Sequence, residues 1–96
     1  KDLLIKLLKA KDHRARAAAV RVLSFWLDRI DNSLELLRAG VNDPHGRVRL
    51  EAVRAISFLR GDGATEVALE VLEHDMDPML QFTLDETIKT LEKATE

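Results

Sequence analysis

The chain has 96 residues, a formal net charge of −2 and no cysteine, so it offers no disulfide, thiolate metal ligand or cysteine nucleophile. This length allows one small domain, and 46% apolar with 33% charged residues indicates a folded globular protein rather than a disordered one. Four glycines, two prolines and no tyrosine disfavour an all-β fold. No apolar run approaches the roughly 20 residues that a membrane-spanning helix needs.

Charge is distributed unevenly along the chain. Residues 1–60 carry 13 Lys and Arg against 7 Asp and Glu, whereas residues 61–96 carry 2 against 10. A basic part and an acidic part on one small body favour contact with oppositely charged neighbours, including head-to-tail self-association. A chance drift of charge along solvated helix faces explains the same numbers, and both interpretations remain open at this point.

A shift of 33 positions aligns the first part of the chain with the second. The aligned identities include Arg14 with Arg47, Arg16 with Arg49, Arg21 with Arg54, Ser24 with Ser57, and Phe25 with Phe58. A further shift of 32 gives a weaker third copy, in which Val48 aligns with Leu80 and Ile56 with Ile88. Periods of this length are typical of helical repeat proteins. The sequence therefore predicts three units, at approximately residues 1–31, 32–62 and 63–96.

Each unit contains a shorter and then a longer stretch of helix-forming sequence. In chain order, helices are expected at Asp2–Lys9, His13–Ile30, Ser33–Ala39, Pro44–Arg60, Ala64–His74 and Pro78–Ala94. The shorter and the longer helix of one unit would form a helical hairpin.

The expected helix boundaries carry characteristic residues. The carboxylates of Asp12, Asp43 and Asp77 are expected to cap the longer helices by accepting hydrogen bonds from unpaired N–H groups. Pro44 and Pro78 follow the last two caps, at the helix position where a missing N–H costs nothing. The remaining boundary residues are Ser33 as a cap, Gly40 and Gly61 at helix ends, and the turn of residues 60–64 between the second and third units.

Apolar residues recur at three- and four-residue steps along each longer helix, which is the pattern of a buried face. These stripes comprise Ala15, Ala19, Val22, Leu23 and Trp26; Val48, Ala52, Ala55, Ile56 and Leu59; and Leu80, Leu84, Ile88 and Leu91. Phe25 and Phe58 lie beside the stripes, and we expect them to pack in the core, with partner binding as the alternative. Because repeated helix pairs bury apolar faces only by stacking, the predicted fold is all-α. It is a single domain over residues 1–96, an α-α superhelix of about three helical hairpins and six helices.

Three stretches of the chain resemble HEAT repeats: Asn42–Ile56 (NDPHGRVRLEAVRAI), Asp12–Leu23 (DHRARAAAVRVL) and, less closely, Asp75–Ile88 (DMDPMLQFTLDETI). The resemblance lies in a turn aspartate, a Val-Arg pair and an apolar second helix, and it covers nearly the whole chain. It implies an α-solenoid and says little about function.

The same resemblance implies a structural role for one arginine in each unit. In HEAT repeats the arginine of the Val-Arg pair binds the turn aspartate or backbone carbonyls of the adjacent unit. Asp43 and Arg49 are therefore expected to form a structural pair. Arg16 occupies the equivalent position, but Ala10 stands where its aspartate would be, and Gln81 replaces the arginine in the third unit.

A narrower resemblance is to the HEAT segment of large exported bacterial proteins that are dehydrogenase-like. In those proteins a propeller precedes the HEAT region and a haem-binding cytochrome domain follows it. This resemblance would place the chain outside the cytoplasm, whereas without it a cytoplasmic location is expected. Any redox chemistry would belong to flanking domains, because no Cys-x-x-Cys-His occurs here. The chain starts at Lys1 within an amphipathic stretch, so we expect it to be a piece of a longer protein.

Four repeated arginines are the candidate partner-contact residues: Arg14, Arg21, Arg47 and Arg54. Stacking of the units would bring equivalent arginines into rows, and such rows could follow a phosphate backbone. The sequence pI of 5.9 and the presence of Glu51 within the row make nucleic acid the less favoured partner.

No cofactor, metal site or catalytic residue is predicted. The histidines, His13, His45 and His74, lack the following glutamate of HEAT-like iron hydroxylases, and no phosphate-binding glycine loop occurs. We therefore expect a non-catalytic interaction, scaffold or spacer module of a larger multidomain protein. Its partner would be another protein or neighbouring domains of the same chain, with nucleic-acid binding and self-association as alternatives.

Overall fold

The computed structural model describes residues 2–59 and 63–95, and every regular element within these ranges is a helix. In chain order the elements are α1 (Asp2–Leu8), α2 (His13–Leu23), the 3-10 helix η1 (Leu27–Arg29), α3 (Ser33–Val41), α4 (Gly46–Ile56), α5 (Ala64–Leu69), the 3-10 helix η2 (Glu70–Glu73) and α6 (Pro78–Thr95). The predicted all-α class with helical hairpins is confirmed. None of the described helices combines the length and the apolar character needed to cross a bilayer.

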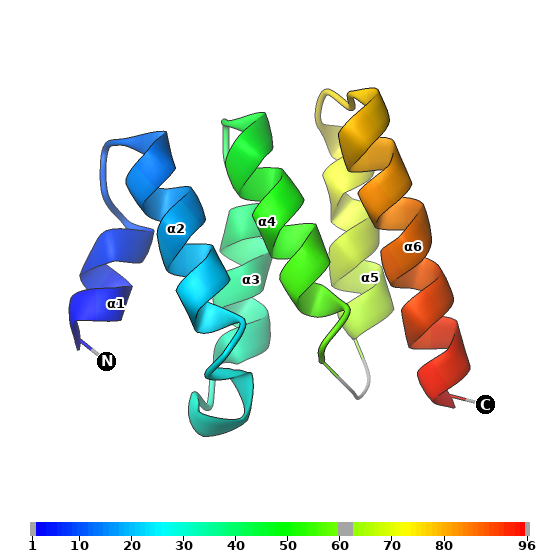
Figure 1. Ribbon diagram of the computed structural model, residues 1–96, viewed down its shortest axis with the longest axis horizontal. Helices are drawn as coiled ribbons and strands as arrows, with labels where there is room; N and C mark the ends of the chain where they lie inside the picture. Colours follow the sequence, from blue (N-terminus) through cyan, green and yellow to red (C-terminus); the bar gives the residue numbers. More distant parts are fainter. Residues whose placement is uncertain (1, 60–62, 96) are drawn as a thin grey trace.

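The helices form three antiparallel hairpins that stack in two layers (Figure 1). Helices α2, α4 and α6 lie side by side in one layer, while α3 and α5 lie behind them in the other. Successive hairpins contact one another through α2, α4 and α6, and the second and third hairpins also touch through α3 and α5. The molecule measures 36 × 30 × 17 Å, so the layer of α2, α4 and α6 presents a broad face to solvent.

The core lies between the two layers and follows most of the predicted stripes. Its fully buried large side chains are Val20, Leu23, Leu37, Val41, Val48, Val53, Ile56, Val71 and Leu80. The prediction was wrong for Val22 and Trp26 in the first stripe, of which Val22 is 46% exposed, and for Phe25 and Phe58 beside the stripes. Trp26 is 44% exposed, and Phe25 and Phe58 are 78% and 63% exposed.

Helices α2 and α4 end earlier than the sequence pattern predicts, at Leu23 and Ile56 rather than at Ile30 and Arg60. Ser24 and Ser57 follow these ends, and each hydroxyl donates to the carbonyl three residues earlier. A serine that binds a nearby carbonyl competes with the helical hydrogen bonds. The chain then turns through short-range bonds, such as Phe58 N to Ala55 O at 3.1 Å, and these turns carry the phenylalanines away from the core. Residue 60 lies outside the described residues, as do the predicted helix end at Gly61 and part of the predicted turn.

The predicted caps are correct for α2 and α6 and wrong for α3 and α4. Asp12 accepts from Arg14 N at 2.9 Å, and Asp77 accepts from Leu80 N at 2.7 Å. Helix α4 begins at Gly46 and its cap is His45, so Asp43 and Pro44 lie in the preceding turn. At α3 the capping position is Asn32, while the Ser33 hydroxyl donates to the carbonyls of Leu27 and Ile30.

Two arginines connect successive hairpins, and we call them the strut arginines Arg16 and Arg49. Arg16 binds the carbonyls of Ala10 and Lys11 in its own turn, and its guanidinium forms two bonds with the Asp43 carboxylate, of 2.7 and 3.0 Å. Bonds of this two-point kind combine charge with defined geometry. The hydrogen bond with Asp43 raises the pKa of Arg16. The first hairpin is thereby fixed to the turn of the second.

The expected Asp43–Arg49 pair therefore needs correction. Arg49 does contact Asp43, but through the backbone carbonyl at 2.8 Å, because the Asp43 carboxylate is occupied by Arg16 and by the N–H of His45. The second bond of Arg49 goes to the Asp75 carbonyl of the next hairpin, at 3.1 Å. Each strut arginine thus connects its own turn to the following one, and the aspartate partner belongs to the following hairpin.

The other layer has a polar connection of its own. Arg38 and Asn42, from the α3 region, both donate to Glu70 at the end of α5, at 3.1 and 3.0 Å. The bond from Asn42 and then that from Arg38 hold the pKa of Glu70 below its ordinary value. His74 contacts Asn42 Oδ1 at 2.8 Å, so the contact continues into the turn before α6.

We predict that Asp43→Ala lowers the free energy of unfolding by about 2–4 kcal/mol, because it removes both carboxylate bonds to the half-buried Arg16 guanidinium and the acceptor for His45 N–H. Urea unfolding followed by circular dichroism measures the loss. Asp12→Ala is the control, since Asp12 is an exposed carboxylate that serves only its own turn. Equal losses in the two variants would contradict the strut role.

We also predict that Gly40→Ala destabilises the domain, although helix propensity alone would favour alanine by about 1 kcal/mol. A Cβ at Gly40 would lie 2.9 Å from the Ala52 Cβ, an atom fixed to the α4 backbone. Overpacking of this kind costs about 1–3 kcal/mol, so the midpoint of thermal unfolding should fall. Gly46→Ala is the control, because its Cβ would lie 3.4 Å from Arg49 Nη2, close to an ordinary van der Waals distance.

Candidate functional site

The four candidate arginines lie in the layer of α2, α4 and α6, but the structure does not leave them equivalent. Arg14 is highly exposed, with 82% of its side chain accessible, and it pairs with Asp12 at 3.3 Å within its own turn. Arg47 stands at the start of α4. Arg21 and Arg54 stand near the ends of α2 and α4. A single uninterrupted row of free cations is therefore absent from the described part of this layer.

Glu51 binds two of the four arginines. Its carboxylate side chain is only 5% exposed, and it accepts from Arg21 of the preceding hairpin at 2.6 Å. Arg47, one turn earlier on α4, lies 3.5 Å from the same oxygen. The hydrogen bond with Glu51 raises the pKa of Arg21. Glu51 therefore joins α2 to α4 and neutralises part of the arginine row, whereas the sequence had suggested only an interruption of that row.

Arg54 differs from the other three. Its side chain is exposed and forms no ion pair or hydrogen bond with any residue among 3–59 and 63–93. It lines the groove between α2 and α4 and also the groove between α4 and α6. Of the four predicted partner-contact residues, Arg54 is the one without an acidic partner among the residues that the structure describes.

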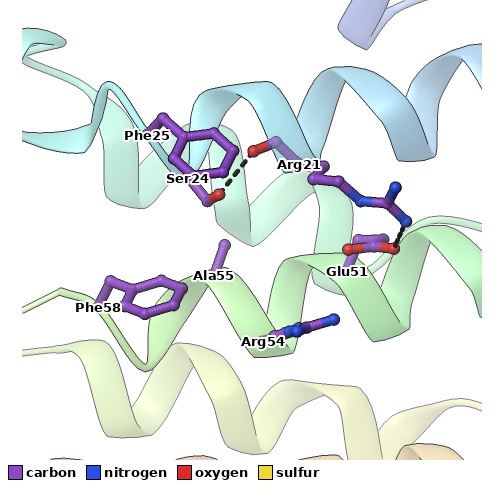
Figure 2. Close-up of a pocket in the computed structure, with 7 residues that line it drawn as sticks. All are labelled: Arg21, Ser24, Phe25, Glu51, Arg54, Ala55 and Phe58. Atoms are coloured by element: carbon purple, nitrogen blue, oxygen red, sulfur yellow. Dashed lines mark hydrogen bonds and ion pairs between the residues drawn. The ribbon is translucent and has the colours of Figure 1, made fainter.

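The groove between α2 and α4 has an apolar part and a charged part, as Figure 2 shows. Phe25, Ala55 and Phe58 form the apolar part, and Arg21, Glu51 and Arg54 form the charged part. We call this the α2–α4 groove; its volume is about 540 Å³, and Ser24 completes its lining. This volume falls in the range of about 300–1,000 Å³ that is typical of binding clefts.

A second, smaller groove continues the same face between α4 and α6. Its volume is about 320 Å³, and Met79 and Phe82 contribute exposed apolar surface on its α6 side. Glu86 lies in this groove at the position on α6 that is equivalent to Arg21 and Arg54. The charge along this row thus changes from basic on α2 and α4 to acidic on α6.

Two histidines meet at the other end of the α2–α4 contact. The rings of His13 and His45 stack in parallel, with centroids 3.6 Å apart, and His45 Nδ1 accepts from Arg47 N at 3.2 Å. The sequence did not reveal this contact, because the repeat register aligns His13 with Gly46 rather than with His45. Among the described residues no group of three His, Asp or Glu side chains is arranged to hold a metal ion.

We predict that Glu51→Gln increases the affinity of the domain for polyanions. The change removes the carboxylate that binds Arg21 and Arg47, so two more cations become available to a ligand. The variant should elute from immobilised heparin at higher salt than the unchanged protein. Glu86→Gln makes the same charge change on α6, where no arginine is bound, and should shift elution less. Equal shifts would show that only net charge matters.

Comparison with protein-family models matches residues 1–89 to the HEAT repeats. No curated protein and no solved structure matches the chain. The narrower resemblance to exported dehydrogenase-like proteins of bacteria therefore gains no support and stays a prediction. The family match spans nearly all of the 96 residues, over the same helices that stack as three hairpins, and the chain belongs to the HEAT-repeat family.

Proposed function

We propose that the chain is a non-catalytic interaction module whose α2–α4 groove holds a partner protein or a neighbouring domain of the same chain. The observation that carries this proposal is the exposure of Phe25 and Phe58, which occupy the same position in successive hairpins. Both line one groove beside Arg21 and Arg54. Aromatic residues and arginine are the side chains most enriched at the centres of protein interfaces.

The family is consistent with this role, because HEAT repeats generally mediate protein–protein interaction or scaffolding and are typically non-enzymatic. The strut arginines hold the hairpins together, so the layer of α2, α4 and α6 forms a broad face before any partner binds. Binding to a preformed face avoids part of the entropy lost when a flexible surface becomes ordered. A scaffold or spacer role uses the same rigidity to set the orientation of neighbouring domains.

Nucleic acid is a weaker candidate for the partner. Binding to a phosphate backbone draws on several free cations. Arg14 pairs with Asp12, and Arg21 and Arg47 share the single carboxylate of Glu51, so two of these three charges are compensated. The remaining charge and that of Arg54 supply little of the electrostatic attraction that such binding requires.

Self-association is a second candidate, because basic and acidic positions lie on the same face. Arg21 and Arg54 on α2 and α4 are followed by Glu86 on α6. A second copy could place Glu86 against one of these arginines. We rank this below a separate partner, because Glu86 already lies 3.5 Å from Lys89.

Site-specific photo-crosslinking tests the proposal. Benzoylphenylalanine replaces Phe58 in the groove or, as the control, Leu69, which is 42% exposed on α5 in the other layer. In cells that produce the protein, position 58 should give protein adducts of discrete mass that position 69 does not give. Identical adducts from both positions would contradict the groove as the site. Adducts of twice the protein's own mass would favour self-association.

A further inference from the structure

The α2–α4 groove has chemistry that defines the kind of partner segment it fits. Its charged part contains Arg21, Glu51 and Arg54, and Arg47 lies beside it, so three arginines surround one carboxylate. The Glu51 side chain is 5% exposed and is occupied by two of them. The groove therefore has an excess of positive charge, and Arg54 has no acidic partner among the described residues. An anionic group on the partner would compensate that charge.

On both walls of the groove, the exposed ring follows the arginine by the same number of residues. Arg21 precedes Phe25 by four residues, and Arg54 precedes Phe58 by four residues. Each arginine stands in the last turn of its helix and each ring in the turn that follows, so the two side chains are separated by about one turn of the chain, or roughly 6 Å at the helical rise per residue. Both walls of the groove thus present a cation and an exposed ring with the same spacing (Figure 2).

A helix is the partner element that matches this spacing. Side chains at positions i and i+4 of a helix lie on one face, about one turn apart. A carboxylate and a large apolar side chain at this spacing would reach the charged and the apolar parts of the groove together. Docking of an amphipathic helix into an apolar groove is a common mode of peptide recognition.

We infer that the α2–α4 groove binds a helical segment of a partner protein that carries Asp or Glu one turn from Leu, Met or Phe. The carboxylate pairs with Arg54, and the apolar side chain packs between Phe25 and Phe58. This inference rests on the proposed function and specifies the partner. Nucleic acid and a second copy of the chain are the competing occupants, and the experiment includes both.

The test uses the 96-residue chain and fluorescein-labelled, alanine-rich helical peptides of about 18 residues. One pair of peptides carries Glu and Leu four residues apart, in either order, since the groove does not fix the direction of the bound helix. Matched peptides carry Gln or Lys for Glu, or Ala for Leu. Fluorescence anisotropy should give the Glu–Leu peptide at least about fivefold tighter binding than the Gln–Leu peptide, as expected for one charged hydrogen bond.

The variants assign the selectivity to the groove. Arg54→Glu should remove the preference for Glu and bind the Lys–Leu peptide more tightly than the Glu–Leu peptide. Phe58→Ser should weaken all peptides that carry Leu. Lys93→Glu, an equal charge change at an exposed position on α6 outside both grooves, should behave like the unchanged chain. Circular dichroism establishes that each variant is folded, and sedimentation shows whether the chain is monomeric during the titration.

Several results would overturn the inference. These are equal binding of the Glu and Gln peptides, unchanged selectivity in Arg54→Glu, or no binding of any peptide up to about 1 mM, the weak limit of specific recognition. Tighter binding of a labelled 20-base-pair duplex than of the Glu–Leu peptide would assign the groove to nucleic acid. Peptide binding only after dissociation of a dimer would assign it to a second copy.

The two proposals can fail separately. Adducts specific to position 58 together with equal binding of Glu and Gln peptides would leave the interaction module intact and remove the carboxylate motif. Selective peptide binding without any adduct specific to position 58 would support the carboxylate motif as the ligand of the groove. It would at the same time contradict the proposal that the groove holds a partner in cells.

Discussion

The paired bonds between Arg16 and Asp43 fix α4 against α2, and the candidate site lies along the contact that they fix. Arg16 takes its carbonyl partners from its own turn and its carboxylate partner from the next hairpin. Hairpins in a solenoid contact only their neighbours, so the spacing of successive hairpins depends on such junctions. At the other end of the same helix pair, Arg21 and Glu51 make a second charged contact across the junction. The α2–α4 groove opens beside this second contact, and both of its residues line the groove.

The repeat period and the apolar stripes were sufficient to predict the stacked hairpins, because burial of a helix face is a property of residue spacing. Helix α6 follows its predicted bounds nearly to the residue, since the sequence contains both its cap and an uninterrupted stripe. The ends of α2 and α4 could not be predicted in this way. No glycine or proline marks them, and the chain leaves the helix where Ser24 and Ser57 bind nearby carbonyls. The exposure of Phe25 and Phe58 follows from those two turns.

The sequence predicted which positions of the candidate site are equivalent, but it did not predict which residues each side chain contacts. The repeat register identifies Arg21 and Arg54 as equivalent, but their surroundings differ, because the partner of Arg21 is Glu51 in the following hairpin. Pairing across a junction depends on the offset between hairpins, which the sequence period does not contain. The same offset explains why the Asp43 carboxylate binds Arg16, whereas Arg49 binds the Asp43 backbone carbonyl.

The strut arginines also decide what a separation of the hairpins would expose. Separating the first hairpin from the second would leave the Arg16 guanidinium without its carboxylate partner, and separating the second from the third would leave Arg49 without the Asp75 carbonyl. Gln81 stands at the strut position of the third hairpin, and within residues 3–59 and 63–93 its side chain bonds to Asp85 on its own helix. Along α6 the stack is held instead by the Thr87 hydroxyl, which donates to Val53 O from a buried position, and by the buried leucines of α6.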